Sequence, residues 1–113
     1  MQRLIEIRSY KLMPDTAAAF HDIMSNKAVP MLQEWHTDVV AYGPSAHEPD
    51  SYFLIRAYND LADLNAQQEA FYGSDAWRQG PRVELLACIE TYLNTVVWLG
   101  PEAIEDMRRR NAS

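Results

Sequence analysis

The chain has 113 residues, which is enough for one domain with a single hydrophobic core. Its 48% hydrophobic content excludes a disordered chain, and its formal net charge of −6 disfavours nucleic acids and anionic membranes as partners. The single cysteine, Cys88, excludes an internal disulfide, and no apolar stretch approaches the roughly 20 residues that span a bilayer.

The first two predicted elements are a strand and a long helix. Polar and apolar side chains alternate over residues 3–12, which indicates a strand. This stretch lacks the apolar run of a signal peptide, so we expect a cytoplasmic protein. From Thr16 to Trp35 apolar residues recur at helical spacing, and Asp15 is the expected N-cap. Pro30 lacks a backbone N–H, so it is expected to kink or end this helix near its last turn.

A hairpin and a second helix come next. Residues 38–43 form a short β-branched run, and residues 51–58 have the strongest strand pattern of the chain. Residues 43–50, with one glycine and two prolines, have the composition of a loop. Asn59 and Asp60 then precede apolar residues at helical spacing, which predicts a capped helix. Gly73 is expected to end this helix in a left-handed cap.

The last third of the chain is predicted to alternate short helical turns with breaks before a final strand. Residues 74–77 and 82–87 are each expected to form a turn of helix, and residues 88–99 form a strand rich in Thr, Val, Tyr and Trp. Residues 101–113 form a charged tail, either a short helix or a frayed end. We therefore expect one domain over residues 1–100, followed by this tail.

The predicted order is β-α-β-β-α-β, the split βαβ pattern of an α+β, ferredoxin-like fold. Such an antiparallel sheet places its first strand between the third and the fourth, and it packs both helices on one face. The other face is then bare, and a second copy of the chain is its simplest cover. We therefore expect a homodimer, and the sequence leaves open whether dimers assemble further.

Five segments of the chain carry a resemblance to a known protein family, and the last of them spans the break at the end of the second helix. They are Leu4–Tyr10, the helix after Pro14, Val40–Gly43, Tyr52–Ala57 and Phe71–Trp77. Together they resemble the NIPSNAP family, which belongs to the dimeric α/β-barrel superfamily. The resemblance covers about residues 3–99 and leaves the tail outside, and Tyr72–Trp77 is its most specific part.

The resemblance implies a dimeric α/β barrel and says little about activity, because small bacterial members of the family mostly lack an assigned one. Related barrels include small monooxygenases of the antibiotic-biosynthesis type and haem-handling proteins. The family supplies no secure catalytic motif, so no catalytic residue is carried over to this chain.

The strand residues sort onto two different faces of the predicted sheet. One face is apolar and is expected to form the core beneath the helices; it carries Ile5, Ile7, Phe53, Ile55 and Leu93. The other is polar and aromatic and is expected to face a second subunit. It carries Glu6, Arg8, Tyr10, Tyr42, Tyr52, Arg56, Tyr58, Glu90, Tyr92, Asn94 and Trp98.

Two interpretations fit the charges on this polar face. The strand order brings Glu6 and Arg8 near Arg56 and Glu90. In the structural interpretation these four groups neutralise one another, since buried charges are costly unless they are paired. In the functional interpretation Arg8 or Arg56 holds an anionic or carbonyl-bearing small molecule, and a tyrosine such as Tyr42 is a further donor.

Two further features have both a structural and a functional interpretation. The segment around Tyr72 and Trp77 is either a helix break with Trp77 in the core or the mouth of a pocket between helix and sheet. His21 borders the apolar stripe of the first helix and is either a boundary residue or a pocket residue. The pocket candidates are Arg8, Tyr10, His21, Tyr42, Arg56, Tyr72 and Trp77.

The sequence predicts no metal site and no cofactor. The three histidines are scattered, and no two have the i, i+4 spacing of a helical metal site. A haem iron needs only one protein ligand, so the spacing between the histidines does not decide whether the protein binds haem. The four glycines stand far apart, which argues against a phosphate-binding loop, and Cys88 has no neighbouring base to activate it.

Three functions remain open from the sequence. The first is a homodimeric barrel that binds a small molecule. The second is a cofactor-independent monooxygenase or isomerase that acts on an aromatic substrate in the same pocket. The third is a subunit whose role is assembly alone. Whether the protein is an enzyme is left open.

Overall fold

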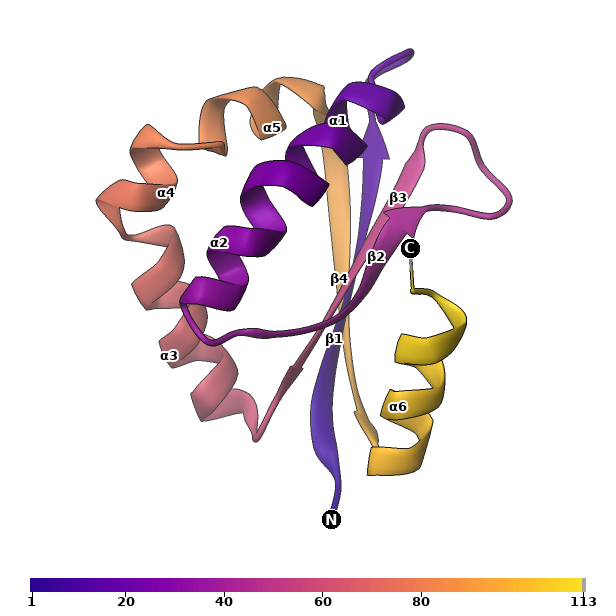
Figure 1. Ribbon diagram of the computed structural model, residues 1–113, viewed down its shortest axis with the longest axis vertical. Helices are drawn as coiled ribbons and strands as arrows, with labels where there is room; N and C mark the ends of the chain where they lie inside the picture. The colour runs from indigo at the N-terminus through magenta and orange to yellow at the C-terminus, as the bar shows by residue number, and fades with distance from the viewer. Residues whose placement is uncertain (113) are drawn as a thin grey trace.

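A computed structural model describes residues 1–112 as a four-stranded antiparallel sheet with helices on both faces (Figure 1). The strand order is β2-β3-β1-β4, so the first strand lies between the third and the fourth, as predicted. The ferredoxin-like α+β fold is therefore confirmed. The strands are β1 (Arg3–Leu12), β2 (Asp38–Pro44), β3 (Ser51–Tyr58) and β4 (Ile89–Leu99).

The helices divide unequally between the two faces of the sheet (Figure 1). One face is covered by α1 (Ala17–Ile23), η1 (Met24–Ala28), α2 (Val29–Glu34), α3 (Leu61–Tyr72), α4 (Asp75–Gln79) and α5 (Arg82–Cys88). The other face carries α6 (Pro101–Arg110) alone. Within residues 1–112, no helix has the length and apolar character needed to cross a membrane.

The first helix passes through Pro30 and continues to Glu34. Its middle part, η1, is π-helical, and the N–H of Val29 bonds the carbonyl of Met24 five residues back. A wider turn directly before Pro30 accommodates a residue that has no N–H and crowds the preceding turn. The predicted N-cap is wrong by one residue, because Asp15 has φ of 64° and Thr16 takes the cap position.

The break after α3 uses glycine for a different reason than predicted. Gly73 has φ of −83°, so the expected left-handed cap is wrong. A Cβ at this position would lie 2.8 Å from the carbonyl oxygen of Glu69. Close approach to the backbone, and not a positive φ, therefore favours glycine here. Ser74 then caps α4 by accepting a hydrogen bond from the N–H of Trp77 (3.2 Å).

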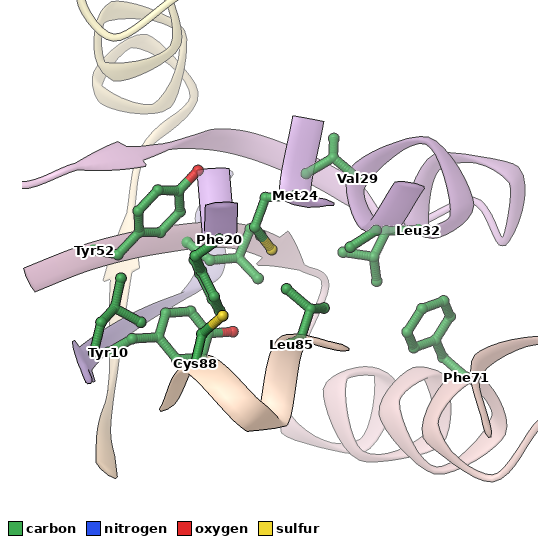
Figure 2. Close-up of a cluster of buried hydrophobic side chains, with 12 residues drawn as sticks. Tyr10, Phe20, Met24, Val29, Leu32, Tyr52, Phe71, Leu85 and Cys88 are labelled. Carbon is green, nitrogen blue, oxygen red and sulfur yellow. The ribbon is translucent and has the colours of Figure 1, made fainter. Parts of the chain in front are cut away.

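The main core lies between the sheet and helices α1 to α5. Figure 2 shows Tyr10 and Tyr52 of the sheet meeting Phe20 of α1, while Leu85 of α5 and Phe71 of α3 lie farther along the same layer. Phe20 packs edge-on against Tyr52 and is tilted against Tyr10, with ring centroids 4.9 and 5.2 Å apart. Aromatic rings therefore take up much of the space that aliphatic side chains usually fill.

The two faces of the sheet are used the other way round from the prediction. The polar and aromatic face lies beneath α1 to α5, where Glu6 and Arg56 are fully buried. The apolar face, with Ile5 and Ile55, lies on the side of α6. The prediction treated the tail as a frayed end or a short helix, and α6 covers part of the second face.

Helix α6 is held against the sheet by apolar packing and by the polar contacts of Arg108. Ile104 is buried against Ile5 and Val40. Arg108 pairs with Asp38 (3.1 Å), and it donates to the carbonyl of Val39 (3.1 Å). Residues 101–110 are therefore an ordered part of the fold, outside the predicted domain boundary at residue 100.

Candidate functional site

A cavity of about 660 Å³ lies between the sheet and helices α1 and α3 to α5. Its inner wall is formed by nearly buried side chains such as Tyr10 and Phe20, and exposed residues such as Arg82 and Glu90 form its mouth. The lining residues are Arg8, Tyr10, Phe20, Gln68, Tyr72, Trp77, Arg82, Leu85, Leu86, Ile89, Glu90, Thr91 and Tyr92.

Beneath this pocket, Glu6 and Arg56 form a fully buried ion pair. The two residues lie directly opposite each other on β1 and β3. Arg56 donates from Nε to Glu6 Oε1 (2.8 Å), and its Nη2 lies 2.5 Å from the same oxygen. The predicted pairing of Glu6 with Arg56 is present, whereas Glu90 instead faces Lys11 at 3.7 Å on the surface.

Arg8 connects this ion pair to the pocket. Period-two alternation on β1 puts Arg8 on the same face as Glu6, and the register puts Asn94 of β4 opposite Arg8. Arg8 donates from Nε to Asn94 Oδ1 (3.0 Å) and from Nη2 to Glu6 Oε2 (3.4 Å). Asn94 and Gln68 each donate to Glu6 Oε2 at 2.7 Å.

The hydroxyl of Tyr72 completes the arrangement from the side of α3. It accepts hydrogen bonds from Arg56 Nη1 (2.8 Å) and from Arg8 Nη1 (3.2 Å). A phenol oxygen has two lone pairs and one proton, so both lone pairs are used and the proton is left to be donated. We call Glu6, Arg8, Arg56, Tyr72 and Asn94 the polar network.

The polar network keeps its charges. Burial raises the pKa of Glu6. The charge of Arg56, the hydrogen bond from Gln68 and the charge of Arg8 together lower it by more than burial raises it, so the pKa of Glu6 lies below its ordinary value. Burial lowers the pKa of Arg56, yet the facing Tyr72 and Glu6 raise it above its usual range. Two guanidinium groups therefore face one carboxylate, and the network carries one excess positive charge.

Arg8 is the cation of this network that lines the pocket. Its side chain is only 11% exposed, so solvent screens its charge weakly. A guanidinium has five N–H donors, and Asn94, Tyr72 and Glu6 take three of them, which leaves two for a ligand.

Two aromatic rings lie near the guanidinium of Arg8. Its Cζ atom lies 4.8 Å from the ring centroid of Tyr92 and 5.8 Å from that of Tyr72. Tyr72 packs edge-on against Trp77 of α4 at 5.3 Å. Burial raises the pKa of Tyr10, on the same wall, to about 12, so this phenol stays neutral at physiological pH.

Four of the seven predicted pocket residues line the cavity. They are Arg8, Tyr10, Tyr72 and Trp77. Arg56 lies beneath them in the polar network.

His21 and Tyr42 form a separate group at the side of the pocket. The Nδ1 atom of His21 lies 2.5 Å from the hydroxyl of Tyr52, and its ring centroid lies 6.1 Å from that of Tyr42. Neither residue is among those that line the cavity. Within residues 1–112, no three metal-ligating side chains gather at one place.

Sequence reasoning missed three polar residues of the site. The helical pattern assigns Gln68 to the apolar stripe of its helix, and strand parity places Asn94 on the correct face without a partner. Their roles depend on the distance between α3, β1 and β4, which no local pattern reports. Arg82 lies at the mouth of the cavity, directly after a helix break. No sequence pattern distinguishes a basic residue at such a position as part of a site.

Comparison with known proteins gives a family match over most of the chain. A family model described as NIPSNAP matches residues 5–97. No curated protein matches the sequence. A NIPSNAP family protein from Agrobacterium tumefaciens superposes with a TM-score of 0.79 at 13% identity, over 88% of this chain and 87% of the other.

Two further solved structures share the fold. An uncharacterised NIPSNAP-like domain protein from Burkholderia xenovorans has a TM-score of 0.79 at 16% identity, over 88% of this chain and 86% of that one. A Nitrosomonas europaea protein, provisionally named an antibiotic biosynthesis monooxygenase, has a TM-score of 0.57 at 20% identity, over 86% and 96%. At such identities these likenesses describe the fold alone.

Proposed function

This chain belongs to the NIPSNAP family, and on that premise we propose that it is a homodimeric barrel that binds a small anionic molecule in the pocket over Arg8. The carrying observation is the charge of the polar network, in which Arg8 and Arg56 share the single carboxylate of Glu6. An excess buried charge is costly without a counterion, so an anion in the pocket would be stabilised.

The donors of the pocket support the same function. Arg8 keeps two N–H groups beyond its three bonds, and Tyr72 keeps its O–H. Arg8 and Tyr72 both line the cavity, and apolar side chains such as Leu85 and Ile89 line it as well. A mostly apolar cavity with a few convergent polar groups is typical of a small-molecule site.

The alternative is a cofactor-independent monooxygenase or isomerase acting on an aromatic substrate. An isomerase needs a base near the substrate. Glu6 already accepts hydrogen bonds from Arg56, Gln68, Asn94 and Arg8. Within residues 1–112, Glu90 is the carboxylate that lines the cavity, and it lies at the mouth beside Lys11. The inner wall thus offers donors, which supports binding over proton abstraction.

Calorimetric titration with carboxylates and their matched amides tests the proposed binding. We expect acids such as benzoate to bind and benzamide to bind at least tenfold more weakly, because the amide does not neutralise Arg8. Arg8→Met should abolish the preference for the acid. Arg78→Met, which removes an exposed arginine of α4, is the matched control and should preserve it.

Equal affinity for acids and amides, or no binding across aliphatic and aromatic acids, would refute anion binding. Oxygen uptake with phenols and quinols separates the enzyme from the binding protein. Sustained uptake that Arg8→Met abolishes would favour the monooxygenase.

The proposed homodimer rests on the half of the second sheet face that α6 leaves uncovered. The register places Phe53, Ser9 and Leu93 in one row across the sheet, and Ile7 and Thr95 in the adjoining row. We call these five residues the open half. Leu93 is 74% exposed, and β4 is an edge strand with one unpaired side. Exposed apolar residues beside an unpaired strand edge favour a protein partner. A second copy of the same chain is the simplest such partner, because most soluble oligomers are homo-oligomers.

We propose the cytoplasm as the location of the protein. Cys88 is buried as a free thiol, and small proteins of oxidising compartments are usually rich in disulfides.

A further inference from the structure

We infer that the ligand of this pocket is a planar aromatic acid whose acidic group is conjugated with its ring, an inference that rests on the proposed anion binding. Tyr10, Tyr72, Trp77 and Tyr92 line the cavity together with Arg8. The guanidinium of Arg8 lies near the rings of Tyr92 on β4 and Tyr72 on α3, and Trp77 on α4 packs edge-on against Tyr72.

The contact with Arg8 sets the plane of the ligand's acidic group. A carboxylate that accepts two bonds from a guanidinium lies in the plane of the guanidinium. Arg8 lies over the ring of Tyr92 at 4.8 Å and within 5.8 Å of the ring centroid of Tyr72. A carboxylate paired with Arg8 in this way therefore lies in one flat layer with the guanidinium, near the ring of Tyr92.

The same layer favours a flat group attached to the carboxylate. In an aryl carboxylate, conjugation keeps the ring coplanar with the acidic group, so the ring extends along the same layer. A saturated ring of the same carbon skeleton is thicker and lacks a π-face. Aromatic pairs gain attraction beyond their buried area, with preferred offset or edge-on geometries. Tyr10 and Tyr92, with ring centroids 6.2 Å apart, provide such surfaces on the sheet side.

The helix break after α3 adds a further ring to this layer. Ser74 starts α4 and thereby sets Trp77 edge-on against Tyr72, with both rings lining the cavity. Trp77 contacts neither Arg8 nor Glu6 through any hydrogen bond among residues 1–112. Its contribution is therefore to the ring of the ligand, and the geometry makes it a specificity-determining residue.

The experiment compares 2-naphthoate with decahydro-2-naphthoate by calorimetric titration of the full chain. The two acids share a carbon skeleton and a charge, and only the first is flat and aromatic. We expect 2-naphthoate to bind about tenfold or more tightly. Trp77→Leu should reduce this ratio severalfold, while Trp35→Leu, which alters an exposed tryptophan outside the cavity, should preserve it.

The ratio measured on the unaltered chain keeps the test decisive if Trp77→Leu folds poorly. Equal affinities for the two acids would overturn the aromatic inference and leave anion binding standing. Failure of both acids to bind, together with the simpler acids, would overturn anion binding itself. If Trp77→Leu and Trp35→Leu lower the ratio of the two affinities equally, Trp77 does not recognise the ring of the ligand.

Discussion

At the scale of single residues, the site depends on three charges that the fold places within one buried layer. Glu6 is the centre of this layer, because it receives hydrogen bonds from β3, β4 and α3 as well as from its own strand. Its two arginine partners differ in role. Arg56 is fully buried and serves the ion pair, whereas Arg8 borders the cavity.

Arg56→Met should destabilise the protein by about 3–5 kcal/mol, because it leaves Glu6 buried without its closest counterion. Urea unfolding followed by circular dichroism measures the loss. The double variant Glu6→Gln/Arg56→Met is the control and should recover part of it, since the unpaired carboxylate is removed as well. A single variant as stable as the unaltered chain would mean that solvent reaches the pair.

The pH dependence of stability should reveal the lowered pKa of Glu6. A carboxyl whose folded pKa is below its unfolded value, about 4.3 for glutamate, stabilises the fold above that value. The stabilisation is lost as the pH falls through the folded pKa. The difference in unfolding free energy between the unaltered chain and Glu6→Gln should therefore shrink as the pH is lowered from neutral.

Urea unfolding at a series of pH values measures this difference. Glu34→Gln, which alters an exposed glutamate of α2, is the matched control and should show little difference at any pH. If the difference in unfolding free energy between the unaltered chain and Glu6→Gln stays constant down to the lowest pH at which both chains fold, the lowered pKa of Glu6 is contradicted.

At the scale of elements, the short helix α4 is held between two glycines that approach the backbone closely. A Cβ on Gly80 would lie 2.4 Å from the carbonyl oxygen of Ala76, and one on Gly73 would lie 2.8 Å from that of Glu69. These contacts determine how α4 leaves α3 and how it ends. They therefore determine where Trp77 enters the cavity.

Gly80→Ala should destabilise the fold by about 1–3 kcal/mol, because the added methyl group forces α4 to shift. Gly100→Ala is the matched control: a Cβ there meets no atom within 4 Å, so only the cost of alanine at the N-cap of α6 is expected, at most about 1 kcal/mol. Thermal unfolding of both variants measures the difference. Equal stability of the two would mean that α4 adapts without strain.

At the scale of the whole molecule, the two faces of the sheet differ in what they carry. The face beneath α1 to α5 holds the pocket and the polar network inside one chain. The opposite face is divided between α6 and the open half. Pocket and proposed dimer contact are therefore built from different residues, contrary to the expectation that one set would form both.

Leu93→Glu should convert the proposed dimer to monomers, because it places a charge on the exposed edge strand of the open half. Val83→Glu is the matched control: Val83 is 67% exposed, but it lies on α5, on the pocket side of the sheet. Sedimentation equilibrium of both variants and the unaltered chain measures the mass. A monomeric unaltered chain, or a dimer that survives Leu93→Glu, would contradict the proposed contact.

The sequence by itself determined the four strands, the helices between them and their order, because alternation and breaks act over a few residues. It left open whether the residues after position 100 form a helix. It also determined that Glu6, Arg8, Tyr10 and Arg56 share one face, since strand parity is a local property. Only the tertiary structure decided which face the helices cover. Parity cannot distinguish a face that is covered by α1 to α5 from one that carries α6.

The same limit applies to the site. Tyr72 was identified from its segment, but its position between two arginines depends on how α3 crosses the sheet. His21 and Tyr42 share the pocket side of the fold and still lie outside the cavity, where His21 is paired with Tyr52. Distances between elements far apart in the sequence depend on the packing of the whole core, and that packing decided which candidate residues meet.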